Sequence, residues 1–194
     1  SSNGSSRVAS HRTPRSKTPR KRAAASSSKT FLTLTPRVND PDAEFFVTRI
    51  YQGEGMYKGA MRNAQREGLG AFFHINGNRY EGEWQADKAH GHGKMTYKDT
   101  SIYDGEWRLG RRHGKGTLTY ASDGRAKSYK GQWEDDAQHG VGLFAWHGGE
   151  SYEGAFVLGA MTGEGRLWFA DGYGYHGPFV DGKRHGKGTT TTPD

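Results

Sequence analysis

The sequence predicts an all-β protein, an elongated single-layer array of tandem β-hairpins preceded by a disordered basic N-terminal tail. One observation is a repeat of 23 or 26 residues that six tyrosines open: Tyr57, Tyr80, Tyr103, Tyr129, Tyr152 and Tyr175. Another is that glycine recurs two, eleven and thirteen residues after each of these tyrosines, which gives all six copies one register. The chain is also only 32% hydrophobic, too little to fill a thick globular core. A fixed period with little apolar material is typical of stacked repeats, which mostly build binding surfaces.

Each repeat is predicted to form one β-hairpin. Bulky residues and glycines alternate from Tyr103 through Gly105 to Trp107, and a period of two places them on one face of a strand. After a turn of about six residues, the alternation resumes at Gly114 and continues to Tyr120. Glycine normally weakens a strand. We therefore expect these glycines to leave room for an aromatic ring that lies flat against the backbone.

The array has recognisable ends. Residues 47–51 alternate like a strand outside the tyrosine–glycine register, so we expect them to cap the first hairpin. Pro178 falls in the first strand of the sixth repeat, and proline is tolerated on edge strands. This predicts a sheet edge near Pro178, and this edge is the candidate contact if copies of the chain associate.

The sequence divides into two parts: the array is predicted to occupy residues 45–194 and the tail residues 1–44. The chain can also be a fragment of a longer protein.

The repeats resemble the MORN repeat family, whose unit reads roughly Tyr-Glu-Gly-Glu-Trp, a basic turn, and His-Gly-Lys-Gly. The resemblance covers residues 57–192. Residues 80–98, 103–120 and 175–188 follow the family pattern closely, residues 129–147 and 152–169 follow it with some drift, and residues 57–74 are looser. It implies a hairpin array that serves as a scaffold in ciliary and flagellar structures, cytoskeletal rims and membrane-contact proteins. It does not imply one shared activity.

The first forty residues carry all of the excess positive charge. They hold nine Lys or Arg and one acid, Asp40, whereas the whole chain has a net charge of +7. With almost nothing apolar before Phe31, this composition predicts disorder in the free chain. The residues that we expect to contact an acidic partner are Arg12, Arg15, Lys17, Arg20, Lys21 and Arg22.

Three threonines in the tail are candidate phosphorylation sites. Thr13, Thr18 and Thr35 each precede a Pro-Arg pair, as in substrates of proline-directed kinases. A phosphate at any of them would cancel about two positive charges.

Several partners fit the charge of the tail: acidic tubulin tails, anionic lipid headgroups and, less favoured, nucleic acid. Basic segments interrupted by proline resemble microtubule-associated regions. The cluster over residues 14–22 also resembles a nuclear localisation signal, and the acid-free start resembles a mitochondrial transit peptide, although Pro14 and Pro19 disfavour its helix. A non-specific solvated tail is the remaining alternative.

Patterns that suggest catalysis or metal binding have simpler structural explanations. His90, His113, His139 and His185 share one place in four repeats, but equivalent sites in adjacent hairpins lie about 10 Å apart, too far to share a metal ion. The paired glycines precede a strand rather than the helix that a phosphate loop needs. The chain has no cysteine, and its carboxylates fall at ordinary repeat positions. No segment approaches 18 apolar residues. We expect no enzyme, no cofactor and no metal.

The second face of the sheet carries the candidate docking residues. Where well-matched repeats have polar residues on that face, repeat four has Val141 and Leu143, repeat five has Trp168 and repeat one has Phe73. Apolar residues on both faces of a one-layer sheet need a cover. A partner protein is the favoured cover, and packing against the linker or the curl of the sheet is the alternative.

A basic rim is expected along the turns, at Lys88, Arg111, Arg112, Lys183 and Arg184. It fades at Asp135 and Asp136 in repeat four and at Ala160 and Met161 in repeat five. A rim that reverses sign predicts that the array alone binds membranes poorly.

These features predict a non-enzymatic scaffold of a cytoskeletal assembly in the cytoplasm, microtubule-associated, in the axoneme of a cilium or flagellum. The array would dock neighbouring proteins and the tail an acidic partner such as tubulin. The alternative is a peripheral membrane adaptor whose tail binds phosphoinositides, at about 1 kcal/mol per basic residue. A third interpretation is the targeting array of a larger enzyme, although no such domain lies in these 194 residues.

Overall fold

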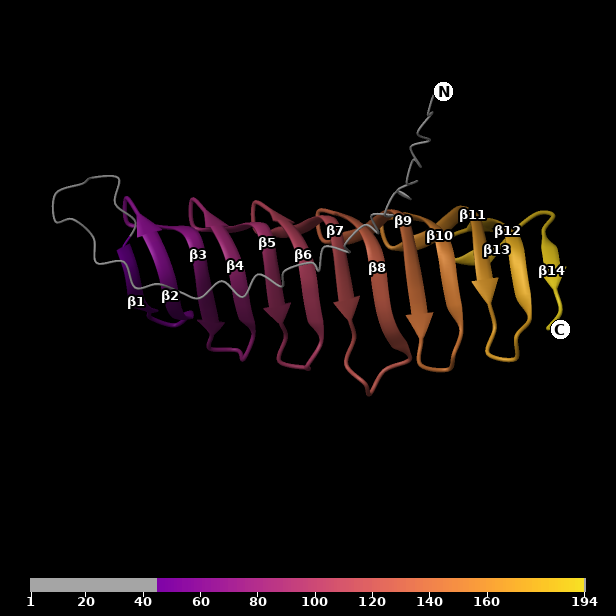
Figure 1. Cartoon of the computed structure of the whole chain (residues 1–194), viewed down its shortest axis with the longest axis horizontal. Helices are drawn as coiled ribbons and strands as arrows, with labels where there is room; N and C mark the ends of the chain where they lie inside the picture. The colour runs from indigo at the N-terminus through magenta and orange to yellow at the C-terminus, as the bar shows by residue number, and fades with distance from the viewer. Residues whose placement is uncertain (1–44, 194) are drawn as a thin grey trace, which may run out of the picture. The chain divides into compact units, whose positions relative to one another are not determined.

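The computed structural model describes residues 45–193, which form one antiparallel sheet of 14 strands. The strands follow one another across the sheet in chain order from β1 to β13, and β14 also pairs with β12 (Figure 1). This confirms the predicted single-layer array. The strands are β1 (Phe45–Tyr51), β2 (Gly55–Arg62), β3 (Gln65–His74), β4 (Arg79–Gln85), β5 (Lys88–Thr96), β6 (Ile102–Arg108), β7 (Arg111–Thr119), β8 (Ala126–Glu134), β9 (Ala137–Trp146), β10 (Ser151–Val157), β11 (Ala160–Trp168), β12 (Gly174–Val180), β13 (Lys183–Arg184) and β14 (Thr189–Thr191).

The turns within the hairpins are shorter than the sequence predicts. Between β4 and β5 only Ala86 and Asp87 form the turn, with φ angles of 47° and 64° that suit a two-residue hairpin loop. The register then shifts between Gly82 and Glu83, and Gly91 takes a φ of 57°. A short turn followed by a bulge interrupts the period of two just as a long turn does. The predicted turn of about six residues is therefore wrong, and the hairpins pair almost to their tips.

Acidic side chains of the first strand stabilise this bulge. Glu83 Oε1 accepts a hydrogen bond from the His92 backbone N–H at 3.2 Å, and Glu106 Oε1 accepts one from Lys115 at 3.0 Å. A Cβ atom built on Gly91 would lie 2.5 Å from Glu83 Oε2, so the carboxylate fills the space that the glycine leaves. These acids are structural.

Tyrosine rings lie directly on the glycines, as predicted. A Cβ atom on Gly116 would come within 2.3 Å of the Tyr103 hydroxyl, and Tyr103 is fully buried. The hydroxyl donates to the Glu106 carbonyl oxygen at 2.9 Å. Burial disfavours the phenolate and raises the pKa of the equivalent Tyr129 to about 12. We call this side of the sheet the aromatic face and the other side the polar face.

Tryptophans connect successive repeats on the aromatic face. The Trp107 ring meets the rings of Tyr80 and Tyr103 edge to face, with centroids 5.2 Å apart in both pairs. Its Nε1 donates to the Gly93 carbonyl oxygen of the preceding repeat at 2.9 Å. Phe156 and Phe179 take this place in repeats five and six and keep the ring contacts. The core is thus one continuous row of rings.

The sequence predicts the N-terminal end of the sheet correctly but not the C-terminal end. Strand β1 pairs with β2 over its whole length, which confirms the predicted cap. The predicted edge at Pro178 is wrong, because β12 is covered on its outer side by β13 and β14. Pro178 pairs with Glu164 of β11, and its carbonyl oxygen accepts a hydrogen bond from His185 N–H at 2.9 Å. A proline is tolerated here because the ladder at this position uses its carbonyl group.

His74 gives the first repeat a sensitivity to acid. Burial, followed by the charge of Arg66, lowers the pKa of His74, and Glu54 opposes the shift. The unfolded chain therefore takes up a proton near pH 6.5 that the folded chain resists, so this contribution to stability is complete above that pH and declines as the pH falls.

We expect His74→Tyr, which copies Tyr97 and Tyr120 at the equivalent place, to remove this part of the acid sensitivity. Urea unfolding at pH 7.5 and pH 5.0 should show the variant gaining stability relative to the parent chain at the lower pH. An equal pH dependence in both chains would contradict a contribution of His74 to the acid sensitivity.

Candidate functional site

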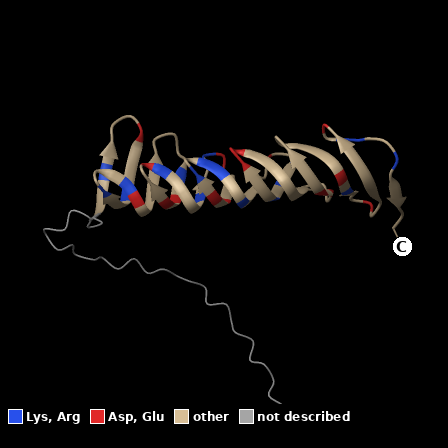
Figure 2. Ribbon diagram, turned by 90° about the horizontal axis from the view of Figure 1, so that it is seen from above, with Lys and Arg blue, Asp and Glu red and all other residues tan. Residues whose placement is uncertain are grey.

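The polar face carries cross-strand rows of charged and polar side chains. Glu81 of β4 pairs with Lys94 of β5, which pairs in turn with Asp104 of β6. Such opposite-charge neighbours stabilise a sheet modestly. Figure 2 shows blue and red segments alternating over the first half of the sheet, whereas the ribbon towards the C-terminus is mostly tan. Charged residues are therefore sparse on β9 to β12, where only Glu153, Glu164 and Arg166 are charged.

Three apolar side chains interrupt the polar face over β9 to β11, and we call them the β9–β11 patch. Val141 is 62% exposed, Leu143 43% and Trp168 37%. Leu143 pairs with Glu153, whereas Trp168 pairs with Ser151, on the same intervening strand. Trp168 is thus about two strand spacings, about 10 Å, from β9. The structure brings these three predicted residues onto one surface.

Charged residues surround this patch. Val141 and Leu143 line a shallow cleft of about 490 Å³ together with Lys115, Lys130 and Glu153. An apolar centre with a charged rim is the usual composition of a protein–protein interface. The patch has this composition on one layer of sheet, where no second layer covers it within residues 45–193.

Phe73, the fourth predicted docking residue, lies elsewhere on the polar face. It belongs to β3, six strands from β9, a separation of about 29 Å. The Arg79 guanidinium carbon lies 4.9 Å from the centroid of its ring, and Lys58 Nζ lies 5.9 Å from it. Phe73 therefore serves as a platform for one cation from each neighbouring strand, Lys58 of β2 and Arg79 of β4.

The basic rim is less basic than the sequence predicts. Arg112 bends onto the aromatic face, where its guanidinium carbon lies 4.4 Å from the Trp133 ring centroid and its Nε lies 3.1 Å from Asp136 Oδ1. Arg111 Nη1 lies 3.9 Å from Asp135 Oδ2. The aspartates expected to reverse the sign of the rim instead pair with its arginines. The other three predicted rim residues, Lys88, Lys183 and Arg184, are exposed.

The repeated histidines occupy the bulges. The Nδ1 atoms of His90, His113 and His139 are buried without a hydrogen-bond partner, and His139 Nε2 lies 3.3 Å from Glu134 Oε2. Among residues 45–193, no three His, Asp or Glu side chains gather closely enough to hold a metal ion. The same residues include no helix that could cross a lipid bilayer.

The predicted contacts and phosphorylation sites of the N-terminal tail lie outside the described residues. This applies to Arg12, Arg15, Lys17, Arg20, Lys21 and Arg22, and to Thr13, Thr18 and Thr35.

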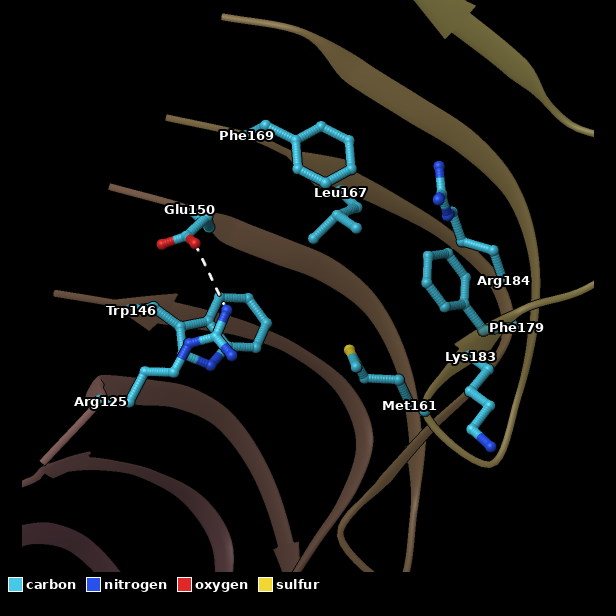
Figure 3. Close-up of a pocket in the computed structure, with 10 residues that line it drawn as sticks. Arg125, Trp146, Glu150, Met161, Leu167, Phe169, Phe179, Lys183 and Arg184 are labelled. Atoms are coloured by element: carbon cyan, nitrogen blue, oxygen red, sulfur yellow. Dashed lines mark hydrogen bonds and ion pairs between the residues drawn. The ribbon is translucent and has the colours of Figure 1, made fainter. Parts of the chain in front are cut away.

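A second cleft, which the sequence analysis missed, lies on the aromatic face. It has a volume of about 560 Å³ and extends from Trp146 and Glu150 to Phe169 and Arg184 (Figure 3). It opens where Met161 occupies the place that Arg112 takes two repeats earlier. The sequence shows methionine at a repeat position where Arg112 stands two repeats earlier. It does not show which space the arginine side chain fills, because that depends on the packing between repeats.

Comparison with protein families agrees with the repeat geometry. The MORN repeat model matches five segments that together cover more than half of the chain: residues 80–102, 103–125, 129–151, 152–172 and 175–194. Hairpin β2–β3 precedes them with the same pairing of glycines, Gly59 with Gly70, which makes it a looser sixth copy. A search of curated proteins found no match to the chain. Repeats of this kind are generally protein- or membrane-interaction modules. The chain therefore belongs to the MORN repeat family.

Proposed function

We propose that this chain is a non-enzymatic docking scaffold of a cytoskeletal assembly, microtubule-associated and part of a ciliary or flagellar axoneme. In this proposal the β9–β11 patch binds a neighbouring protein, and the basic residues 12–22 bind an acidic partner such as tubulin. The observation that carries the proposal is the exposure of Val141, Leu143 and Trp168 on a face that is otherwise polar. Contiguous apolar surface rimmed by charge marks an interaction site.

The sequence itself supplies a matched variant for the patch. Repeat three has Lys115, Thr117 and Thr119 at the positions of Val141, Leu143 and Trp168 counted from the repeat tyrosine. The triple substitution V141K/L143T/W168T therefore gives the patch the polar surface of a neighbouring repeat. We expect it to leave the thermal midpoint within a few degrees, because solvent-exposed substitutions usually change stability by less than about 0.5 kcal/mol each.

Docking is tested with a photo-crosslinking amino acid at position 143 in cells that express the full chain. We expect one discrete crosslinked protein, lost when W168T is added and not formed from the same amino acid at position 94, an exposed place on the polar face outside the cleft. Equal adducts from both positions would show that the patch has no partner of its own.

The anchor is tested by co-sedimentation of the full chain with microtubules and with phosphoinositide vesicles. A second chain carries glutamine at the six basic positions R12Q, R15Q, K17Q, R20Q, K21Q and R22Q. We expect microtubule binding that weakens at least tenfold in this variant and with rising salt. Binding to vesicles alone would favour the membrane adaptor instead, since a polybasic segment is attracted to anionic lipid by the same charge.

A further inference from the structure

Two arginines bind an aspartate of the following repeat through the same contacts. The Arg112 backbone N–H and Nε donate to Asp136 Oδ1 at 3.0 and 3.1 Å, and Nη2 donates to the Asp136 carbonyl oxygen at 2.7 Å. Arg66 and Asp87 repeat these contacts at 2.9, 3.1 and 2.8 Å. In both pairs the aspartate N–H donates back to the arginine carbonyl oxygen at 3.1 Å. One aspartate residue thus supplies a carboxylate, a carbonyl oxygen and an N–H.

The repeat position of Arg66 and Arg112, and that of their aspartates, are joined in the same way between the other three pairs of successive repeats. The residues there are Ala89 with Gly110, Gln138 with Gly159, and Met161 with Gly182, and in each pair the glycine N–H donates to the carbonyl oxygen of the first residue. Arginine therefore occurs with aspartate, and an uncharged residue occurs with glycine. The correlation has a physical reason, since a guanidinium held against aromatic rings and partly out of water needs an anion.

Arg184 is the third arginine at this position. It pairs with Phe179 in the same register in which Arg112 pairs with Trp107. Its guanidinium carbon lies 5.3 Å from the Tyr175 ring centroid. It lies 5.7 Å from the ring centroid of Phe169, and both Arg184 and Phe169 are drawn in Figure 3. Among residues 45–193, no carboxylate forms an ion pair with Arg184. Arg184 thus lies over aromatic rings as Arg112 does, but it is exposed, whereas the Arg112 side chain is only 20% exposed. The cover that Arg184 lacks among the described residues is the ring and the aspartate that Trp133 and Asp136 of the following repeat give Arg112.

The 560 Å³ cleft lies directly beside this arginine. Trp146, Met161 and Leu167 give it an apolar lining, and Figure 3 shows them between Arg184 and Glu150. Two of its other charged residues, Lys183 and Arg125, are basic, and Glu150 already lies 3.4 Å from Arg125. The cleft therefore combines apolar surface with an excess of positive charge.

We propose that Arg184 and this cleft form a docking site for a segment of a partner protein that presents an aspartate or glutamate beside a bulky apolar side chain. The carboxylate takes the place at Arg184 that Asp136 takes at Arg112, and the apolar side chain enters the cleft against Met161 and Phe169. A polypeptide is favoured over a lipid headgroup because the internal pairs use the backbone groups of the acidic residue as well as its carboxylate. The site lies on the aromatic face, so it does not depend on the β9–β11 patch.

The probe is a fluorescent cyclic peptide with the sequence of residues 132–138, which presents Asp136 together with Trp133. Its binding to the full chain is followed by fluorescence anisotropy. We expect Arg184→Gln to weaken binding at least tenfold, and asparagine in place of the aspartate in the peptide to do the same. Lys127→Gln, an exposed lysine outside the cleft, is the charge-matched control. An affinity for R184Q within twofold of the parent chain, or no binding to either, would overturn the proposal.

A second variant fills the cleft with the chain's own pair. M161R/G182D installs the arginine and aspartate found in the other two pairs, and Gly182 has a φ of 76° close to the 72° of Asp136. We expect this variant to retain the thermal midpoint and to lose the peptide, whereas persistent binding would overturn the role of the cleft. Binding that depends on Arg184 to phosphatidylserine vesicles but not to the peptide would replace the protein partner with a lipid. An Arg184-dependent dimer in sedimentation would replace it with a second copy.

Discussion

Gly105→Ala is expected to lower the free energy of unfolding by about 3 kcal/mol, at the upper end of the usual cost of overpacking. A Cβ atom there would lie 2.4 Å from Gly116 Cα and 2.7 Å from the Lys115 carbonyl oxygen, both backbone atoms of the paired strand. It would also lie 2.7 Å from the Tyr103 hydroxyl, on a fully buried ring. Neither neighbour can move without opening the hairpin. The thermal midpoint should fall by about 6–12 °C.

Gly124→Ala is the matched control for this substitution. Gly124 lies in a connection between hairpins, and the nearest atom to an added Cβ is the Ala121 carbonyl oxygen at 4.0 Å. We expect its thermal midpoint to change by no more than about 2 °C. If both substitutions have the same small effect, the contact between ring and glycine is not what restricts this position.

The damage from Gly105→Ala should also be local. Each repeat contacts only its neighbours, so stability is close to a sum of repeats and the interfaces between them. Hydrogen exchange should accelerate most in β5 to β8 and least in β1 and β12. Uniform acceleration over the whole sheet would instead indicate a single cooperative unit.

Arg112→Ala is expected to cost about 2 kcal/mol, and combining it with Asp136→Gly should recover most of this loss. The single substitution removes contacts to Trp133 and leaves the Asp136 carboxylate without its guanidinium. The double variant copies the natural pair of Ala89 and Gly110. Glycine also relieves Asp136 of a φ of 72°, which disfavours a residue with a side chain.

A double-mutant cycle by urea unfolding measures this coupling. Because the Asp136 side chain is 48% exposed, solvent screens part of the charge interaction. The coupling should therefore fall between 50 mM and 1 M NaCl but not vanish, since the bond to the Asp136 carbonyl oxygen is shielded less. Additive effects of the two substitutions would show that arginine and aspartate at these positions are independent.

The sequence by itself determined the fold class, the repeat register and the assignment of residues to the two faces. The reason is that a period of two and a fixed glycine spacing are local properties. Gly105 and Gly116 could be placed under an aromatic ring from the residue pattern alone, because a close approach explains glycine in a strand, whereas the structure identified that ring as Tyr103. Val141, Leu143 and Trp168 were identified as a departure from the polar pattern for the same reason.

Only the tertiary structure decided what happens between repeats. Local alternation cannot distinguish a long turn from a two-residue turn with a bulge, so the sequence misplaced the hairpin tips. Nor could it show that Arg112 bends inward to Asp136, because the two residues are 24 positions apart. Pro178 was assigned to an edge because the pairing of β13 and β14 with β12 was unknown. Contacts between neighbouring strands of different repeats depend on register across the sheet, and only this packing shows that a methionine in place of arginine at position 161 leaves a cleft beside Arg184.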